Sequence, residues 1–348
     1  MIDLNDKQAI AKIDKKNVYG SVSYLTKQVT QAWEDTQKIT FPTDYKQVNN
    51  IVLCGMGGSA YAAYVIKALY TSKLRVPCEL VNGYDLPAYV HEHTLVLLSS
   101  YSGTTEEVLS CGQQALMRKA KITGVCEGGA LAGFFSKNNL PAYIFTPINN
   151  PAGQPRLGQG YMIFGHMGLL KAMGLLDVSD EEVASAVQFV DEQTEAIEIK
   201  AKEIAHSLVE KIPVIVAAEH LSGNAHTLRN QFNETAKNFS AYSLLPELNH
   251  HLMEGLVHPE ARILIFLFLK SQLYSKIVQT RLTLTKEVVE KNNIATIGID
   301  VVGDSHLSQM LYALSFGGYL TFYLGILYGQ DPSVIPWVDF FKEKLSKS

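Results

Sequence analysis

The sequence predicts an α/β protein with two parallel sheets, each covered by helices on both faces. Short apolar runs alternate with helical segments in two separate stretches of the 348-residue chain, and a loop rich in glycine or serine follows the first strand of each stretch. Strands buried on both faces have this uninterrupted apolar character, and helices that cross between them are typical of parallel sheets. A chain of this length is long enough for two domains.

The first stretch of alternation follows an N-terminal helical segment, in which apolar residues from Val18 to Trp33 recur at helical spacing. Buried strands are then expected at NIVLCG, CELV, TLVLLSS, KITGVC and AYIFT, which occupy residues 50–55, 78–81, 94–100, 121–126 and 142–146. We therefore expect a helical segment over residues 1–40 and a first α/β domain over residues 41–155.

The second stretch follows a helical connector, expected over residues 156–210. Strands are predicted at PVIVAAE, AYSLLPE, ILIFLFL and ATIGID, so the second domain is expected over residues 211–348, with C-terminal helices. Residues 310–329 carry no charge and are long enough to cross a membrane. Their four glycines and four tyrosines instead favour a helix buried in the core or at a subunit interface.

Composition narrows the classes of partner. The net charge is only −4, with acidic and basic residues mixed along the chain, so neither nucleic acid nor a membrane surface is an expected partner. The four cysteines have neither CxxC nor Cys/His spacing, which predicts neither a zinc site nor a disulfide framework. The polar N-terminus lacks the apolar run of a signal peptide. We expect a cytoplasmic protein without a metal ion.

The first candidate binding loop is GMGGSA, residues 55–60, where a strand meets a helix. Glycines allow the backbone to approach an anion, and a helix N-terminus presents free N–H groups to it. The same residues fit the dinucleotide fingerprint GxGxxG/A, with Glu79 placed for a ribose hydroxyl. A plain tight turn is a third interpretation. At this point an NAD-dependent oxidoreductase stays an alternative.

The second candidate loop is SYSGTTEE, residues 100–107, again between a strand and a helix. It brings together the hydroxyls of Ser100, Ser102 and Thr105 and a glycine. An ordinary helix cap needs only one hydroxyl. Several neutral donors beside unpaired backbone N–H groups are instead suited to a phosphate monoester.

The chain resembles the bifunctional phosphoglucose/phosphomannose isomerases, which consist of two flavodoxin-like sugar-isomerase (SIS) domains. The resemblance covers essentially the full length and keeps the order of the motifs VYGSVSYL, GMGGSA, SYSGTTEE, PRLGQGY, NQFNETAK, LPELNHH and DPSVIPWVDFFKEKL. It implies interconversion of glucose 6-phosphate, and of mannose 6-phosphate, with fructose 6-phosphate. It also implies that no cofactor or metal is used, and that a homodimer shares its active sites between subunits.

The resemblance assigns roles to individual residues. Glu234, in NET where the family has NEN, matches the base that moves a proton through an enediolate. Arg156 matches the arginine that stabilises the enediolate charge, and His250 matches a histidine that assists ring opening and comes from the partner subunit. Lys342 matches a C-terminal lysine near the substrate. The matching phosphate-binding positions are Gly57, Gly58, Ser59, Ser100, Ser102 and Thr105.

Two departures from the family pattern and one alternative function stay open. His251 stands where the family usually has Asn, so it could exchange roles with His250. PRLGQGY differs from the usual PRxxLGY, which leaves room for an altered substrate preference. The alternative is an SIS protein that binds a sugar phosphate and regulates a partner without catalysis. The presence of Arg156, Glu234 and His250 together favours the enzyme, since a sensor needs no base.

Overall fold

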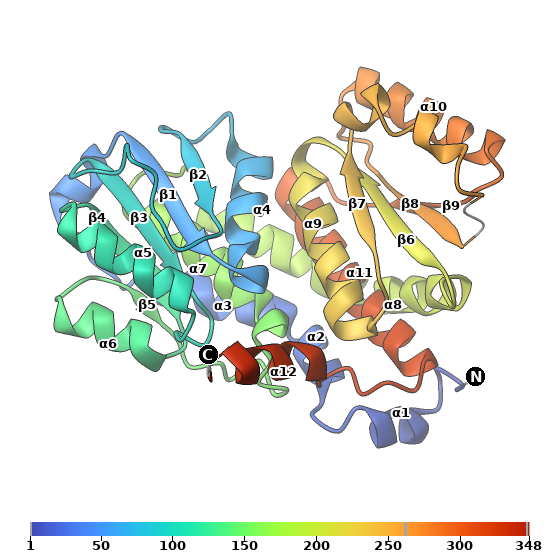
Figure 1. Cartoon of the computed structure of the whole chain (residues 1–348), viewed down its shortest axis with the longest axis horizontal. Helices are drawn as coiled ribbons and strands as arrows, with labels where there is room; N and C mark the ends of the chain where they lie inside the picture. The colour runs from blue at the N-terminus through green and yellow to red at the C-terminus, as the bar shows by residue number, and fades with distance from the viewer. Residues whose placement is uncertain (1, 261–262, 346, 348) are drawn as a thin grey trace.

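The computed structural model describes residues 2–260, 263–345 and 347, which form two parallel sheets lying side by side (Figure 1). The strand order is β2-β1-β3-β4-β5 in the first sheet and β7-β6-β8-β9 in the second. In both sheets the first strand in sequence lies between the second and the third, which is the flavodoxin-like order. The predicted fold class, with two such α/β units, is confirmed.

The strands lie where the apolar runs predict them. They are β1 (Asn50–Gly55), β2 (Cys78–Val81), β3 (Thr94–Ser99), β4 (Lys121–Cys126), β5 (Tyr143–Ile144), β6 (Ile212–Ala217), β7 (Ala241–Leu244), β8 (Leu264–Lys270) and β9 (Ala295–Asp300). Two strands are much shorter than expected: β7 has four residues in place of seven, and β5 has two in place of five. The strand β5 lies at the edge of its sheet between Pro141 and Pro147, and prolines cannot donate a hydrogen bond to a sheet ladder.

The helices cover both faces of the sheets. They are α1 (Lys7–Ile13), α2 (Val18–Ser23), α3 (Leu25–Thr36), α4 (Tyr61–Tyr70), α5 (Glu106–Met117), α6 (Gly129–Lys137), α7 (Gln159–Ala172), α8 (Asp180–Ser207), α9 (Ser222–Gln231), α10 (Lys276–Lys291), α11 (His306–Leu327) and α12 (Pro336–Leu345). Successive residues of β1 point to opposite faces. Ile51 and Leu53 therefore join the large core shared with the second unit, whereas Val52 and Cys54 join a smaller core under α5 and α6.

The charge-free stretch near the C-terminus forms α11, a helix of 22 residues. Its length and composition would allow it to cross a membrane, but 94% of its most apolar window is buried inside the protein. Every residue from Leu307 to Leu327 is buried, and α11 packs along α8. This is the buried core helix that the sequence predicts.

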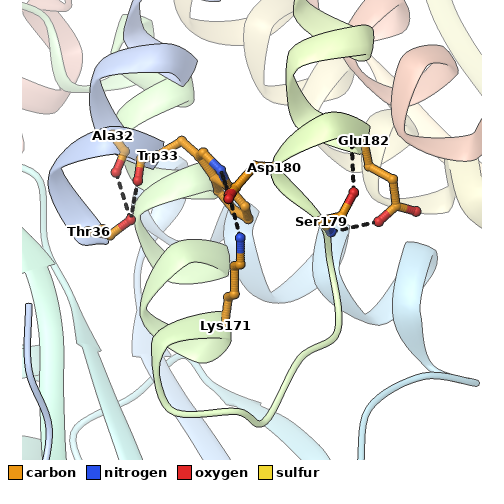
Figure 2. Close-up of polar contacts among 7 residues, drawn as sticks. All are labelled: Ala32, Trp33, Thr36, Lys171, Ser179, Asp180 and Glu182. Atoms are coloured by element: carbon orange, nitrogen blue, oxygen red, sulfur yellow. Dashed lines mark hydrogen bonds and ion pairs between the residues drawn. The ribbon is translucent and has the colours of Figure 1, made fainter. Parts of the chain in front are cut away.

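A polar junction joins α3, α7 and α8 (Figure 2). Asp180, the first residue of α8, accepts a hydrogen bond of 2.8 Å from the indole nitrogen of Trp33 and forms an ion pair with Lys171. Ser179, which precedes α8, and Glu182 in its first turn form a reciprocal capping box with bonds of 3.0 and 2.9 Å, which defines where α8 begins. The junction anchors the C-terminal end of α7, whose N-terminal end follows Arg156.

Candidate active site

The loop after β1 forms a tight turn that packs against the segment containing Arg156. Residues Gly57–Ala60 make a 3-10 turn before α4, and Gly57 has a φ of +51°, which suits glycine. A Cβ atom on Gly58 would lie 3.4 Å from the Cα of Arg156. The predicted phosphate loop and the predicted arginine are therefore neighbours, although they are almost a hundred residues apart in sequence.

Ser59 links this turn to the loop after β3. Its hydroxyl accepts a hydrogen bond of 3.0 Å from the backbone N–H of Tyr101, and its carbonyl accepts one of 2.6 Å from the hydroxyl of Ser99. The two loops follow β1 and β3, the strands on either side of the point where the strand order reverses. In open α/β sheets, ligands bind outside the carboxyl ends of the strands at this point.

The loop after β3 is held in one conformation by its own hydroxyls. The Ser100 hydroxyl shares a hydrogen bond of 2.7 Å with that of Thr105 and accepts one of 3.1 Å from the N–H of Gly103. Gly103 has a φ of +69°, and a Cβ atom there would lie 1.9 Å from the carbonyl oxygen of Gly128. Only glycine fits this position. Ser102 is partly exposed, and its hydroxyl shares a hydrogen bond with the neighbouring Thr104.

Arg156 is almost fully buried, at 4% exposure. Its guanidinium donates hydrogen bonds to the side-chain oxygen of Gln154 (3.0 Å) and to the carbonyls of Pro332 (2.6 Å) and Ser333 (3.0 Å). Within the described residues its buried Nε has no hydrogen-bond partner. Burial lowers the pKa of Arg156, and the nearby Glu234 carboxylate opposes this shift. An arginine side chain stays protonated in proteins, so a fixed cation whose Nε–H is unpaired among the described residues lies at this place.

Glu234 lies in an irregular turn at the end of α9. The helix passes into a π-helical turn, Phe232–Ala236, a feature that often occurs at functional sites. Burial raises the pKa of the Glu234 carboxyl, while the charges of Arg156, Lys237 and Lys342 act to lower it. The carboxyl is thus partly buried and close to cations from three different parts of the chain.

Two further side chains support this arrangement, and neither of them is assigned a role from the sequence. Lys237 ends the π-helical turn, and its ammonium donates to the carbonyls of Glu234 (2.7 Å) and Pro332 (3.4 Å). Gln159 donates a hydrogen bond of 2.9 Å to the carbonyl of Arg156. The available signals were the inclusion of Lys237 in the NQFNETAK motif and the departure from the family pattern at Gln159.

His250 and Lys342 differ in their relation to this site. Lys342 lies on α12, which runs beneath the two sheets in Figure 1. Its positive charge acts to lower the pKa of Glu234. His250 is exposed in a 3-10 turn after β7, whereas Glu234 precedes β7, so the two lie at opposite ends of the second sheet. His251 is also exposed and pairs with Glu247 at 2.8 Å. One chain alone does not place His250 beside Glu234.

The position of Glu79 does not fit the dinucleotide alternative. Glu79 pairs in the sheet with Val52, three residues before the end of β1 at Gly55. Three strand residues span about 10 Å, and the acid that binds a ribose should instead lie at the end of its strand. The carboxylate of Glu79 also accepts a hydrogen bond from the Tyr89 hydroxyl.

Comparison with known proteins identifies the family. Residues 197–345 match the model of the bacterial phospho-glucose isomerase C-terminal SIS domain. A bifunctional phosphoglucose/phosphomannose isomerase from Caldicellulosiruptor bescii is 29% identical over 344 residues, which cover 95% of this chain and 99% of the relative. One from Aquifex aeolicus is 31% identical over 318 residues, covering 90% of this chain and 94% of the relative.

A crystal structure of a hypothetical protein from Thermus thermophilus superposes with a TM-score of 0.76 at 15% identity, covering 98% of this chain and 92% of that one. At this identity the similarity shows a common fold. The two sequence relatives cover 95% and 90% of this chain, which is enough to extend over both sheets. The chain therefore belongs to the family of bifunctional phosphoglucose/phosphomannose isomerases.

Proposed function

We propose that this protein is a hexose 6-phosphate isomerase that interconverts glucose 6-phosphate and mannose 6-phosphate with fructose 6-phosphate. The observation that carries the proposal is the partly buried carboxyl of Glu234, which interacts electrostatically with the buried Arg156 cation. The Arg156 segment packs against the Gly57–Ala60 turn at the predicted phosphate site. The family name of the relatives, phosphoglucose/phosphomannose isomerase, gives the substrate class.

The phosphate would bind at the carboxyl ends of β1 and β3. Both loops have backbone N–H groups and hydroxyls there, and α5 begins directly after Thr105. A helix N-terminus favours an anion through its free N–H groups and its dipole. With the phosphate held by Ser59, Ser100, Ser102, Thr105 and the glycine turn, the sugar would extend towards Arg156.

The chemical step would be proton transfer between two adjacent carbons. Glu234 removes the proton from C2 of the open-chain aldose, which leaves an enediolate, and returns it to C1 to form the ketose. Glucose and mannose 6-phosphates differ only in configuration at C2, so both give the same enediolate. Arg156, with its free Nε donor, would stabilise the negative charge more strongly in the transition state than in the neutral substrate.

Ring opening requires a second proton donor, and we assign this role to His250 of a second copy of the chain. His250 lies at the end of the second sheet opposite Glu234, so its own chain does not supply it to that base. A homodimer with shared active sites would bring the two residues together. The proposed reaction needs no cofactor and would take place in the cytoplasm.

A coupled assay with each hexose 6-phosphate tests the function. With EDTA present, we expect the wild-type protein to turn over glucose 6-phosphate. Glu234→Gln should lose about 10²–10⁴-fold in kcat, the usual contribution of a general base, while still binding sugar phosphate. Glu195→Gln, on the exposed face of α8, is the matched control and should keep full activity.

The same assay separates the enzyme from the regulatory alternative. A protein that binds hexose 6-phosphate without turnover would be a sensor, and a Glu234→Gln variant with an unchanged rate would rule out the proposed base. Turnover that disappears with EDTA would contradict the metal-independent mechanism.

A further inference from the structure

We infer that Lys237 is a positioning residue that keeps the turn bearing Glu234 and the segment bearing Arg156 in one fixed arrangement, through a shared contact with the carbonyl of Pro332. The inference rests on the proposed isomerisation and concerns the same site. Lys237 itself need not touch the substrate.

The contacts of Lys237 join two distant segments. Its ammonium donates hydrogen bonds of 2.7 and 3.4 Å to the carbonyls of Glu234 and Thr235, inside the π-helical turn. It also donates one of 3.4 Å to the carbonyl of Pro332, 95 positions away in sequence. The backbone of Lys237 has a φ of +57°, an uncommon conformation for a residue with a side chain. The backbone of Lys237 thus ends the π-helical turn, and its side-chain ammonium binds carbonyls of the same turn.

The carbonyl of Pro332 is also the principal acceptor for Arg156. The guanidinium binds it at 2.6 Å and binds the next carbonyl, that of Ser333, at 3.0 Å. Ser333 is buried, and its N–H and hydroxyl both donate to the carboxylate of Asp331, at 2.8 and 2.6 Å. These bonds hold the segment to Asp331, and the carbonyl oxygen of Pro332 accepts hydrogen bonds from cationic side chains of both halves of the site.

The charged groups that face Lys237 are Arg156, Asp331 and Glu234. Burial, together with repulsion from Arg156, lowers the pKa of Lys237 to about 8, while Asp331 and Glu234 oppose the shift. A protonated ammonium makes stronger, charge-assisted hydrogen bonds than a neutral amine. The arrangement should consequently be tight below pH 8 and weaken as the pH rises through this value.

The test measures kcat, KM and the pH profile of three variants in the full-length protein. Lys237→Met removes the donors and the charge at similar length, and we expect kcat to fall by about 10²-fold, because a misplacement of about 1 Å in a catalytic group has an effect of this size. KM should change by less than about twofold, since the phosphate loops are untouched. Lys291→Met, an exposed lysine on α10, is the control and should match the wild type.

Lys237→Arg distinguishes positioning from mere folding. We expect the kcat of Lys237→Arg to be about tenfold higher than that of Lys237→Met. We also expect that kcat to show no decline above pH 8, because a guanidinium does not titrate there. Thermal melting shows whether each variant is folded. If Lys237→Met does not fold, the pH profile of Lys237→Arg decides alone.

Two results would overturn the inference and leave the proposed function intact. One is an active wild type with an unchanged kcat in folded Lys237→Met. The other is a Lys237→Arg profile that declines above pH 8 as the wild type does. A wild type without turnover on any hexose 6-phosphate would instead refute the proposed function, and the inference with it.

Discussion

Replacing Arg156 by lysine tests both the stability and the catalytic part of the interpretation in one variant. The guanidinium binds three acceptors at once, the side chain of Gln154 and the carbonyls of Pro332 and Ser333. Its Nε has no partner in the part of the chain that the structure describes, and is available to the substrate. A lysine keeps the positive charge, but it has a single ammonium in place of the planar fork of donors.

The expected magnitudes follow from these contacts. If the ammonium satisfies one of the three acceptors, the other two lose their bond to this side chain, at about 1–3 kcal/mol for each buried oxygen. The lower part of that range applies, because Gln154 is only partly buried and the carbonyl of Pro332 keeps its contact with Lys237. A loss of about 2–4 kcal/mol in the free energy of unfolding is therefore expected from the lower part of that range. Removing a donor to a developing oxyanion typically reduces kcat by about 10²–10³-fold, equivalent to about 2.7–4 kcal/mol.

The measurements are thermal or denaturant unfolding and steady-state kinetics with fructose 6-phosphate and glucose 6-phosphate. KM should change little, because the phosphate is assigned to other loops. Arg75→Lys, at an exposed arginine beyond α4, is the matched control and should leave stability and kcat unchanged. A folded Arg156→Lys variant whose kcat stays within about twofold of the wild type would refute the assignment of Arg156 to the enediolate.

Three other predictions follow from the site and the fold. Because burial raises the pKa of Glu234 and the base must be deprotonated, kcat/KM should fall as the pH decreases through a value above 4.5, the ordinary pKa of this group; a flat profile down to pH 4.5 would contradict this. Gly103→Ala should lower the melting temperature markedly, since a Cβ would clash with the Gly128 carbonyl, whereas Gly133→Ala on α6 has open space and should not; equal melting temperatures would refute the argument. Mixing and re-assembling inactive Glu234→Gln and His250→Ala subunits should restore roughly a quarter of wild-type activity, because half of the random dimers are mixed and one of the two shared sites in each is intact. No recovery of activity in exchanged dimers would refute the sharing.

Much of the fold follows from local pattern. The apolar runs at residues 50–55 and 94–100 predict β1 and β3 because a central parallel strand is buried on both faces along its whole length. The edge strand β5 is shorter than its apolar run predicts, because the prolines on either side of it cannot donate to the sheet. The long uncharged run could be assigned to the core from its tyrosines and glycines, and α11 is buried as expected.

The site is less predictable from sequence. The motifs single out Arg156 and Glu234, but only through a resemblance, and they leave the role of Lys237 unassigned. The distortion of the end of α9 into a π-helical turn has no signal in the helical periodicity of that segment. The separation of His250 from Glu234 follows from the direction of β7 between them, which becomes apparent once the sheet order is known.

The sequence by itself determined which segments form strands and helices, which two loops carry hydroxyls and glycines, and to which family the chain is related. These properties depend on residues that are neighbours in the chain. The tertiary structure alone decided what surrounds each charge. Arg156 binds the carbonyl of Pro332, 176 positions away, and the pKa of Glu234 depends on burial and on cations from three separate segments. Burial and electrostatic interaction depend on distance in space, and that distance exists only once the two sheets have packed together.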